Sequence, residues 1–412
     1  MSNPYRERIH GERVDVIVVG GGLTGLALAI AIGRVGARVA VIEAQTFETL
    51  VSAPHDGRVT AIALGSKRLL EGIGVWERME GEAEAILDIE VGEPDSLGRV
   101  HYDHREIGDD PLGWIVENRV TRNALVDTAR GLETVRLIPS ARVERIERDA
   151  GAVAVTTDSG EVLRGSLMAV CEGRQSSTRD RLGISARRWS YDQLGIVCTL
   201  RHEQPHGGLA VERFFPDGPF AMLPMRDNRS SIVWALETGL AKQVTALDDD
   251  AFVAEVSERF GDSLGRLSLE GRRWAYPLQL VWSDSYVAER VALVGDAARG
   301  IHPIAGQGWN LALRDVAALA EIIADRMRLG LDPGDGAALE NYAAWRRFDG
   351  LALVAVTDGI NRLFANDFTP LRLARETGLA VVDRLPPARR FFMRHAMGLV
   401  GDLPRLMRGE AL

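Results

Sequence analysis

Short runs rich in β-branched residues alternate with longer apolar segments at the start of the chain. Val14–Val19 and Arg38–Ile42 are runs of the kind that form strands buried on both faces of a parallel sheet. Between them, residues 23–35 have helical character. The pattern therefore predicts a strand, a helix and a second parallel strand, which is the start of an α/β fold.

The middle of the chain changes to short alternating runs separated by turn residues. Residues 86–115 and 188–239 predict antiparallel strands, with a hairpin at the Asp-Asn turn 227–228. Residues 45–68 are a breaker-rich stretch before a short helix. Helices are also expected at 118–130, 249–260 and 309–327, and most of the chain after 327, as far as 400, is expected to be helical. The other expected strands are a β-meander at 135–173 with a buried strand at 167–171, a strand at 272–281, and a buried strand from 290 that stops at Gly295-Asp296.

A glycine-rich turn joins the first predicted strand to the first predicted helix. The segment Gly20-Gly21-Gly22-Leu23-Thr24-Gly25 has the GxGxxG spacing, and Glu43 stands at the end of the second strand. Strand, glycine turn, helix, strand and acid in this order predict a dinucleotide site. Gly20 would allow the tight turn, Gly22 would let a diphosphate approach the backbone, and Gly25 would let helix and strand pack closely. The helix N-terminus would supply amide donors, and Glu43 would accept ribose hydroxyls.

A second unusual loop lies at residues 295–315, where GDAARGIHPIAGQGWNLALRD joins a buried strand to a long helix. Asp296 is placed at the carboxyl end of that strand, where doubly wound sheets bind ligands, and could accept from ribityl hydroxyls. The alternative for Asp296 is a turn or N-cap aspartate. The backbone amides of Gly308, Trp309 and Asn310 begin the helix and could stabilise negative charge on a flavin ring.

Composition and charge narrow the class of protein. With 412 residues, 46% hydrophobic and 26% charged, the chain is expected to be globular and too long for one ordinary core. A net charge of −9 argues against nucleic-acid binding. Cys171 and Cys198 lie in apolar runs, so no disulfide framework or cysteine metal site is expected. No apolar stretch reaches the ~20 residues of a membrane span, and no secretory signal appears at the N-terminus. These features indicate a cytoplasmic protein.

Several motifs spread along the chain are more specific than the glycine turn. They include "DGRVTAIALGSKRLLEGIGVW", "WIVENRVTRNAL", "PHGGLAVERFFPDGPFAMLP" and "GDAARGIHPIAGQGWNLALRD". On these residues the chain resembles the class A flavin monooxygenases of the para-hydroxybenzoate hydroxylase type, and more closely the ubiquinone-biosynthesis hydroxylases. The resemblance implies FAD, NADH or NADPH as electron donor, and transfer of one oxygen atom from O₂ to a polyprenylated phenol through a flavin C4a-hydroperoxide.

The resemblance also implies site residues. It places the FAD contacts at Gly20, Gly22, Leu23, Thr24, Gly25, Glu43, Arg58, Asn118, Arg119, Gly295, Asp296, Gly308, Trp309 and Asn310. The reaction chamber beside the flavin ring would be formed by Pro303, Gly306, Gln307 and Gly308. The chain departs from the family pattern at Arg299, where histidine is frequent and hydrogen bonding beneath the flavin could differ, and at Glu172, where aspartate is usual. No metal site is expected, because the histidines show no HExxH spacing.

The expected organisation is a Rossmann-like FAD-binding domain interleaved with a strand-rich substrate domain. Residues 1–85, 115–185 and 285–330 would form the first, residues 86–114 and 186–284 the second, and residues 331–412 a helical C-terminal region. Within the substrate domain, the segment FFPDGPFAMLPM at 214–225 could line an apolar tunnel or could be ordinary sheet core. The sequence leaves these two interpretations open.

The C-terminal region combines arginines with apolar residues. Arg384, Arg389, Arg390, Arg394, Arg405 and Arg408 accompany Phe391, Phe392, Met393 and Met397. Such an end could lie on the inner face of the cell membrane or dock to a quinone-synthesis complex, or it could be a helix packed on the body with solvated arginines. Two other functions also stay open: hydroxylation of a small soluble aromatic, and a non-catalytic FAD-binding role in a quinone-synthesis complex.

Overall fold

The structure is a computed structural model, and it describes residues 12–53, 56–94, 99–301, 306–347, 349–350, 378 and 381–412. Its centre is a six-stranded sheet in the order β19-β20-β13-β2-β3-β9. The strands are β19 (Val287–Ala288), β20 (Val291–Leu293), β13 (Leu167–Val170), β2 (Val16–Val19), β3 (Val39–Ile42) and β9 (Val135–Ile138). All neighbours run parallel except β19 and β20. The buried parallel strands expected near 14–19, 38–42 and 167–171 are confirmed.

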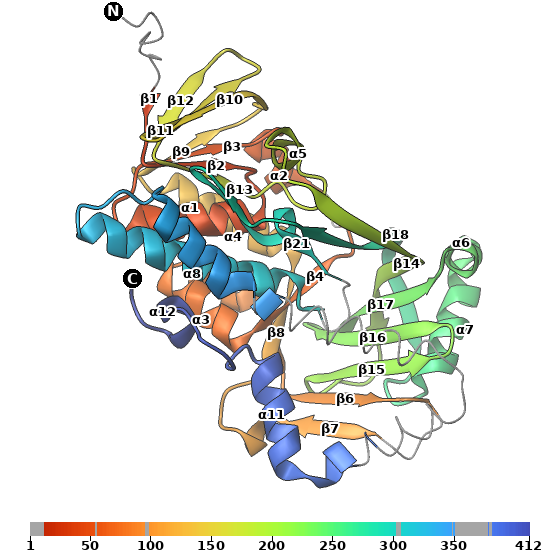
Figure 1. The fold of residues 1–412 in the computed structure, drawn as a ribbon. Coiled ribbons are helices and arrows are strands. Elements are labelled where there is room, and N and C mark those ends of the chain that lie inside the picture. Colours follow the sequence, from red (N-terminus) through yellow and green to blue (C-terminus); the bar gives the residue numbers. More distant parts are fainter. Residues whose placement is uncertain are drawn as a thin grey trace, which may run out of the picture.

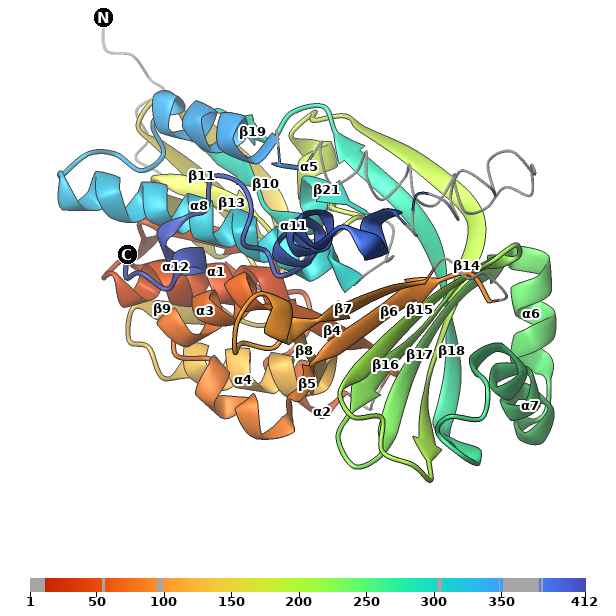
Figure 2. The ribbon, with the colours of Figure 1, turned by 90° about the horizontal axis from the view of Figure 1, so that it is seen from below.

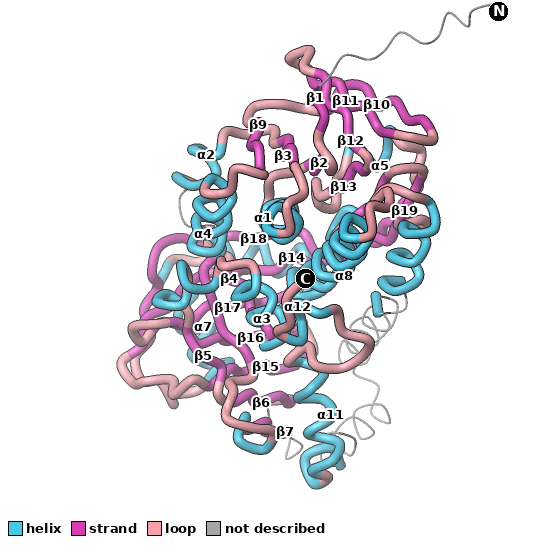
Figure 3. The backbone as a smooth tube through the Cα atoms, turned by 90° about the vertical axis from the view of Figure 1, so that its left-hand side faces the viewer, coloured by secondary structure: helices cyan, strands magenta, loops and turns pink. Residues whose placement is uncertain are grey.

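Alternate residues of the central sheet face two different layers. Val16 and Val18 pack with helices α1 (Leu23–Arg34), α4 (Asn118–Arg130) and α8 (Gly308–Arg328), whereas Ile17 and Val19 pack with a four-stranded sheet. That sheet has the order β1-β12-β11-β10, with β1 at Glu12–Arg13, β12 at Val162–Gly165, β11 at Ala152–Thr157 and β10 at Val143–Asp149. The three layers are visible in Figures 1 and 3. The period of two along β2 thus produces a doubly covered sheet.

A second large sheet extends away from this core (Figure 1). Its order is β21-β18-β14-β17-β16-β15-β6-β7. The strands are β21 (Arg299–Gly300), β18 (Leu267–Ser283), β14 (Ala186–His202), β17 (Arg229–Glu237), β16 (Gly218–Met225), β15 (Leu209–Phe215), β6 (Asp88–Gly92) and β7 (Val100–Asp103). Helices α6 (Thr238–Ala246) and α7 (Asp249–Phe260) cover one face of it (Figure 2). The expected hairpin is confirmed, because Asp227 and Asn228 form its turn with φ of 63° and 52°.

A small three-stranded sheet lies between the two larger ones. It consists of β4 (Val59–Ala63), β8 (Gly113–Glu117) and β5 (Glu84–Ile86), in the order β4-β8-β5. The short helices nearby and elsewhere are α2 (Phe47–Ser52), α3 (Leu64–Gly72), α5 (Ser177–Arg181), η1 (Trp76–Arg78), η2 (Glu80–Glu82), η3 (His104–Glu106) and η4 (Gly295–Ala297). The sequence pattern missed α2 and β4, because each is only five or six residues long and the breakers Pro54 and Gly57 lie between them.

The C-terminal part is helical where the structure describes it. Residues 336–347 are helical, and α11 (Pro386–Ala396) and α12 (Arg405–Arg408) follow later in the chain. Met393 of α11 and Met397, directly after it, are buried against Leu64 and Ile86. Helix α11 therefore packs where α3, the three-stranded sheet and the large sheet come together (Figure 1).

Candidate active site

In the glycine turn after β2, two glycines leave no room for a side chain and a third one does. Gly20 has a φ of +103°, and a Cβ on it would lie 2.8 Å from the carbonyl carbon of Cys171. A Cβ on Gly25 would lie 1.9 Å from the carbonyl oxygen of Gly20. A Cβ on Gly22, in contrast, would meet no described atom within 4 Å. The tight turn and the close packing are thus explained by the protein itself, whereas the space beside Gly22 suits a ligand.

Helix α1 begins at this open space with Leu23 and Thr24 in its first turn. No described side chain caps its N-terminus. The first amides of a helix have no carbonyl partner within the helix, so they are available to a phosphate oxygen. The cradle at Gly22 and the uncapped amides together fit a diphosphate group.

Glu43 lies at the end of β3, beside the glycine turn. Its Oε2 accepts a hydrogen bond from the amide of Gly21 at 2.7 Å, and its Oε1 accepts one from the amide of Gln45 at 2.9 Å. These bonds hold the carboxylate against the turn. Each carboxylate oxygen has a second lone pair, so a ribose hydroxyl could still donate to Glu43.

The second loop meets the first one in space. A Cβ on Gly295 would lie 3.1 Å from Cγ2 of Thr24, and Gly295 has a φ of +63°. Its amide donates to Oδ2 of Asp315, on α8, at 3.0 Å. The strands β2 and β20 flank β13 and run parallel to it, so their carboxyl ends share one sheet edge. The two predicted cofactor motifs therefore lie side by side.

Asp296 has a partner that the sequence did not indicate. Nε of Arg174 lies 3.0 Å from Oδ2 of Asp296, and the same guanidinium donates to the carbonyl oxygens of Ile301 and Gln279. Arg174 follows β13 at the same sheet edge. This position was the one feature of the sequence that could have indicated a role for Arg174 in ligand binding. The side chain of Asp296 is about one-third exposed and lines a large cavity, so a ligand in that cavity can reach its carboxylate.

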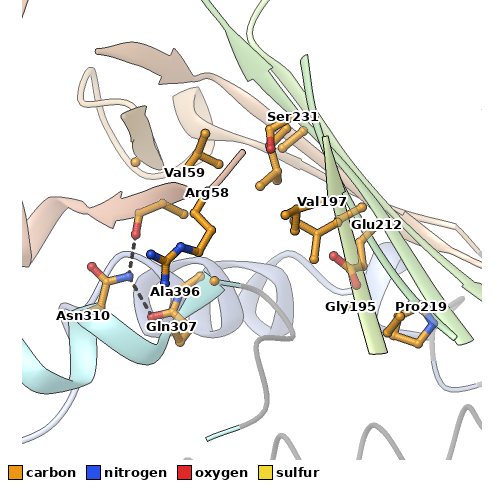
Figure 4. Close-up of a pocket in the computed structure, with 18 of the residues that line it drawn as sticks. Arg58, Val59, Gly195, Val197, Glu212, Pro219, Ser231, Gln307, Asn310 and Ala396 are labelled. Atoms are coloured by element: carbon orange, nitrogen blue, oxygen red, sulfur yellow. Dashed lines mark hydrogen bonds between the residues drawn. The ribbon is translucent and has the colours of Figure 1, made fainter. Parts of the chain in front are cut away.

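A large cavity opens between the cofactor loops and the eight-stranded sheet (Figure 4). Its volume is about 1300 Å³. The predicted site residues that line it are Arg58, Asn118, Asp296, Gly306, Gln307 and Asn310. Most other lining residues are apolar and come mainly from the sheets and from residues 382–396; they include Ile86, Ile89, Leu112, Ala210, Phe214, Pro219, Ala221, Leu223, Val233, Leu278, Val382 and Phe392.

Arg58 and Asn118 project into this cavity from neighbouring chain segments. The guanidinium of Arg58 lies 5.3 Å from the ring centroid of Tyr276 and 2.5 Å from Oδ2 of Asp56. Burial alone would raise the pKa of Asp56, but the hydrogen bonds and charge of Arg58 lower it below its ordinary value. Oδ1 of Asn118 accepts from the hydroxyl of Thr60 at 2.6 Å.

Arg119 is turned away from the cavity. Its Nε lies 2.5 Å from Oε2 of Glu117, its side chain is half exposed, and it is absent from the described cavity wall. Arg119 is therefore not among the residues that could contact FAD inside this cavity, and its predicted FAD contact stays a prediction. Of these two residues at the start of α4, Asn118 lines the described cavity and Arg119 pairs with Glu117.

The start of α8 forms the cofactor-side wall of the cavity. A Cβ on Gly308 would meet no described atom within 4 Å, and no described side chain caps the helix. Asn310 anchors the helix to β4, because its Nδ2 donates to the carbonyl oxygen of Ala61 and its Oδ1 accepts from the amide of Ala63. Trp309 packs partly buried against the core, away from the described cavity wall. Pro303 lies outside the described residues.

The eight-stranded sheet forms the opposite wall of the cavity. Residues 214–225, for which tunnel lining and sheet core were both open interpretations, belong to this sheet. Pro219, Ala221 and Leu223 of β16 line the cavity. The intervening residues Phe220 and Met222 pack in the core beneath α6 and α7. Both interpretations are therefore right, one for each face of the strand, because successive side chains point to opposite faces.

Arg299 lies behind the second loop. Its side chain is fully buried, pairs with Asp315 at 2.6 Å and lies 5.2 Å from the ring centroid of Tyr286. Because it points into this buried network, it is absent from the described cavity wall. At this position the arginine side chain is thus held by Asp315 behind the loop. Glu172 likewise has a structural role, since it accepts hydrogen bonds from Ser176 and from the amide of Thr178 at the start of α5.

Comparison with known proteins agrees with this geometry. The chain matches the FAD binding domain family over residues 13–355. It is 46% identical to ubiquinone hydroxylase UbiL of Rhodospirillum rubrum, across 97% of this chain and 93% of that protein. The chain belongs to the family of FAD-dependent ubiquinone hydroxylases. It is also 31% identical to the 3-demethoxyubiquinol 3-hydroxylase of Escherichia coli, across 93% and 98% of the two chains.

The fold of this ubiquinone hydroxylase family member is shared with solved monooxygenases. A crystal structure of p-nitrophenol 4-monooxygenase PnpA from Pseudomonas putida matches with a TM-score of 0.77 at 19% identity, covering 95% of this chain and 99% of that one. The expected fold class is confirmed. The protein is a FAD-dependent monooxygenase with NAD(P)H as electron donor.

The described residues also bear on disulfides, on metal sites and on membrane-spanning helices. Both cysteines are free and buried, and no cluster of three metal-ligating side chains occurs among the described residues. In that same part of the chain, no helix combines the length and the apolar character needed to cross a bilayer.

Proposed function

We propose that this enzyme inserts one oxygen atom from O₂ into the ring of a polyprenylated phenol in ubiquinone biosynthesis. The size and the apolar lining of the cavity are the observation that carries the proposal. Its volume of about 1300 Å³ exceeds the ~300–1,000 Å³ of ordinary small-molecule pockets, as expected of a cavity that would hold both the flavin ring and a substrate. Two relatives, a ubiquinone hydroxylase and a 3-demethoxyubiquinol 3-hydroxylase, support the same substrate class.

Bound FAD supplies electrons taken from NADH or NADPH and activates O₂. The chain's own residues bind and orient the reactants. The uncapped N-terminus of α1 binds the diphosphate, and Glu43 accepts from the adenosine ribose. The first amides of α8, near Gly308, stabilise negative charge on the flavin ring. Apolar walls from the eight-stranded sheet exclude water from the reacting ring.

The same proposal divides the chain by task. Residues 1–85, 115–185 and 285–330 hold the cofactor, residues 86–114 and 186–284 receive the substrate, and residues 331–412 form the helical C-terminal region. Contacts to FAD are proposed for the residues at the two loops and on the cofactor-side wall of the cavity. Arg174 is added to this set because it holds Asp296 in place.

We further propose that α11 places the enzyme on the inner, cytoplasmic face of the cell membrane. Phe391 and Phe392 are 55% and 45% exposed, and Arg390 and Arg394 are exposed beside them. Phe392 also lines the cavity, so the exposed apolar face adjoins the cavity wall. A membrane-dissolved tail could enter there. Three arginines of this region have other partners, since Arg389 pairs with Glu106, Arg405 with Glu321 and Arg408 with Glu410.

Tail dependence tests the substrate. Each buried CH₂ stabilises binding by about 0.8 kcal/mol, or about fourfold, so kcat/KM is expected to rise with the length of the prenyl tail. Product formed per NAD(P)H should be measured for prenylated phenols of increasing length and for the untailed phenol. Ala221→Phe adds a ring to the cavity wall and should penalise tailed substrates most; Ala254→Phe, on an exposed face of α7, is the matched control.

The outcomes separate the alternatives. Equal turnover of tailed and untailed phenols would identify a hydroxylase of small soluble aromatics. NAD(P)H oxidation and O₂ uptake that never respond to any phenol would identify a non-catalytic component. Membrane binding is tested by sedimentation with anionic and with zwitterionic vesicles, where Phe391→Ser should release the protein from the anionic vesicles. Retention of that variant would point to docking on a protein complex instead.

A further inference from the structure

Glu212 is a carboxylic acid in an aliphatic part of the cavity wall. It lies in β15, directly opposite Ala221 of β16, and Ala221 in turn lies opposite Val233 of β17. All three residues line the cavity. Figure 4 shows Glu212 extending from the sheet on the side opposite Arg58, Gln307 and Asn310. A ring placed between the two walls would have the cofactor loops on one side and this carboxyl group on the other.

The carboxyl group of Glu212 has no described partner, although its side chain is only partly exposed to solvent. Within the described part of the chain, no hydrogen bond or ion pair reaches it. Its neighbour Arg213 faces the other side of the sheet and pairs with Glu90. Burial raises the pKa of Glu212 to about 7. A partly buried acid without a partner costs stability, and such groups concentrate at functional sites.

The other ionisable groups that face the cavity do not neutralise Glu212. Arg58 is paired with Asp56, and Arg174 is paired with Asp296. Tyr102 is neutral, because burial raises its pKa to about 12, and burial also raises the pKa of Tyr276. The natural partner of Glu212 is therefore a group that arrives with the substrate.

We propose that Glu212 binds the hydroxyl group of the phenol substrate and accepts its proton while oxygen is transferred to the ring. This inference rests on the proposed function. The phenolic O–H bond breaks, its electron pair stays on the phenolic oxygen, and a new O–H bond forms on the carboxylate. Electron density on the ring carbons rises, which favours attack on electrophilic oxygen. The net reaction is phenol, O₂, NAD(P)H and H⁺ giving hydroxyphenol, water and NAD(P)⁺, with Glu212 returning its proton to the product.

This role predicts a particular pH dependence. Below about pH 7 Glu212 is protonated and cannot accept a proton. Hydroxylation should therefore rise with pH through about 7 and then level off. Reduction of the flavin by NAD(P)H in the absence of a phenol, which does not use Glu212, should not show this limb.

Glu212→Gln tests the proposal with a change of charge at nearly constant shape. Turnover to hydroxylated product should fall by about 100-fold or more, the range for loss of a general base. FAD content should be unchanged, and the rise of turnover through pH 7 should disappear. Glu237→Gln is the matched control, because Glu237 is an exposed acid of the same sheet. A second measurement needs no variant: the wild type should hydroxylate the methyl ether of its phenol about 100-fold more slowly.

Two outcomes would overturn the assignment. One is a Glu212→Gln enzyme with wild-type turnover and an unchanged pH profile; the other is a wild type that accepts phenol and methyl ether equally. Either would leave the proposed function intact if prenylated phenols are still hydroxylated. Failure of the wild type to hydroxylate any prenylated phenol would instead defeat the proposed function.

Discussion

Asp315 holds two buried arginines and the second cofactor loop at the same time. Its Oδ1 lies 2.6 Å from Nη2 of Arg299 and 2.8 Å from Nε of Arg346, and all three side chains are buried. Its Oδ2 accepts from the amide of Gly295 at 3.0 Å. Burial alone would lower the pKa of Arg299, but the charge of Asp315 raises it above its ordinary value. Asp315→Asn keeps the shape of this side chain and removes its charge.

The cost of that change follows from the geometry. Asp349, at 2.6 Å, still pairs with Arg346, but Arg299 loses the carboxylate that it contacts. Removing one partner of a buried ion pair costs about 3–5 kcal/mol. The Tm changes by on the order of 2 °C per kcal/mol in large domains, so we expect a fall of roughly 6–10 °C. FAD affinity should fall as well, because the amide of Gly295 loses its charged acceptor.

Thermal unfolding followed by circular dichroism, together with FAD titration, measures both effects. Asp284→Asn is the control: it removes the charge from an exposed pair with Arg187, at 3.4 Å, and should cost less than about 1 kcal/mol. If Asp315→Asn is no more destabilising than Asp284→Asn, the buried network does not stabilise the fold. If FAD affinity is unchanged although stability falls, Asp315 does not position the loop.

Four further substitutions test the cofactor loops. Gly22→Ala should leave the FAD-free protein folded and weaken FAD binding. Gly25→Ala should instead destabilise the FAD-free protein by about 1–3 kcal/mol, because its Cβ would lie 1.9 Å from the carbonyl oxygen of Gly20. Equal behaviour of the two variants in unfolding and FAD titration would contradict the proposed diphosphate site. Gly308→Val should lower FAD occupancy, or product formed per NAD(P)H, without unfolding the chain, and normal values of both would remove its amide from the flavin ring. Glu43→Ala should weaken FAD binding by about 10–100-fold, measured by fluorescence titration, since it removes a charged hydrogen-bond acceptor; unchanged affinity would move the ribose contact elsewhere.

Much of the fold was predictable from the sequence because the relevant information is local. The helices at 118–130 and 249–260 were predicted with their observed bounds. Successive side chains of a strand or helix report its period, and glycine spacing reports where the backbone must turn or pack closely. For the same reason the sequence could identify the two cofactor motifs and the Asp-Asn hairpin without any knowledge of their partners.

The tertiary structure decided how these pieces meet. The contact between Gly295 and Thr24, the pairing of Arg174 with Asp296 and the inward direction of Arg299 depend on residues far apart in sequence. Periodicity could not tell which face of β16 would meet helices and which would meet a cavity. Only the register of the assembled sheet, with Glu212 opposite Ala221, places that acid in the aliphatic wall, where a carboxyl group loses its solvation.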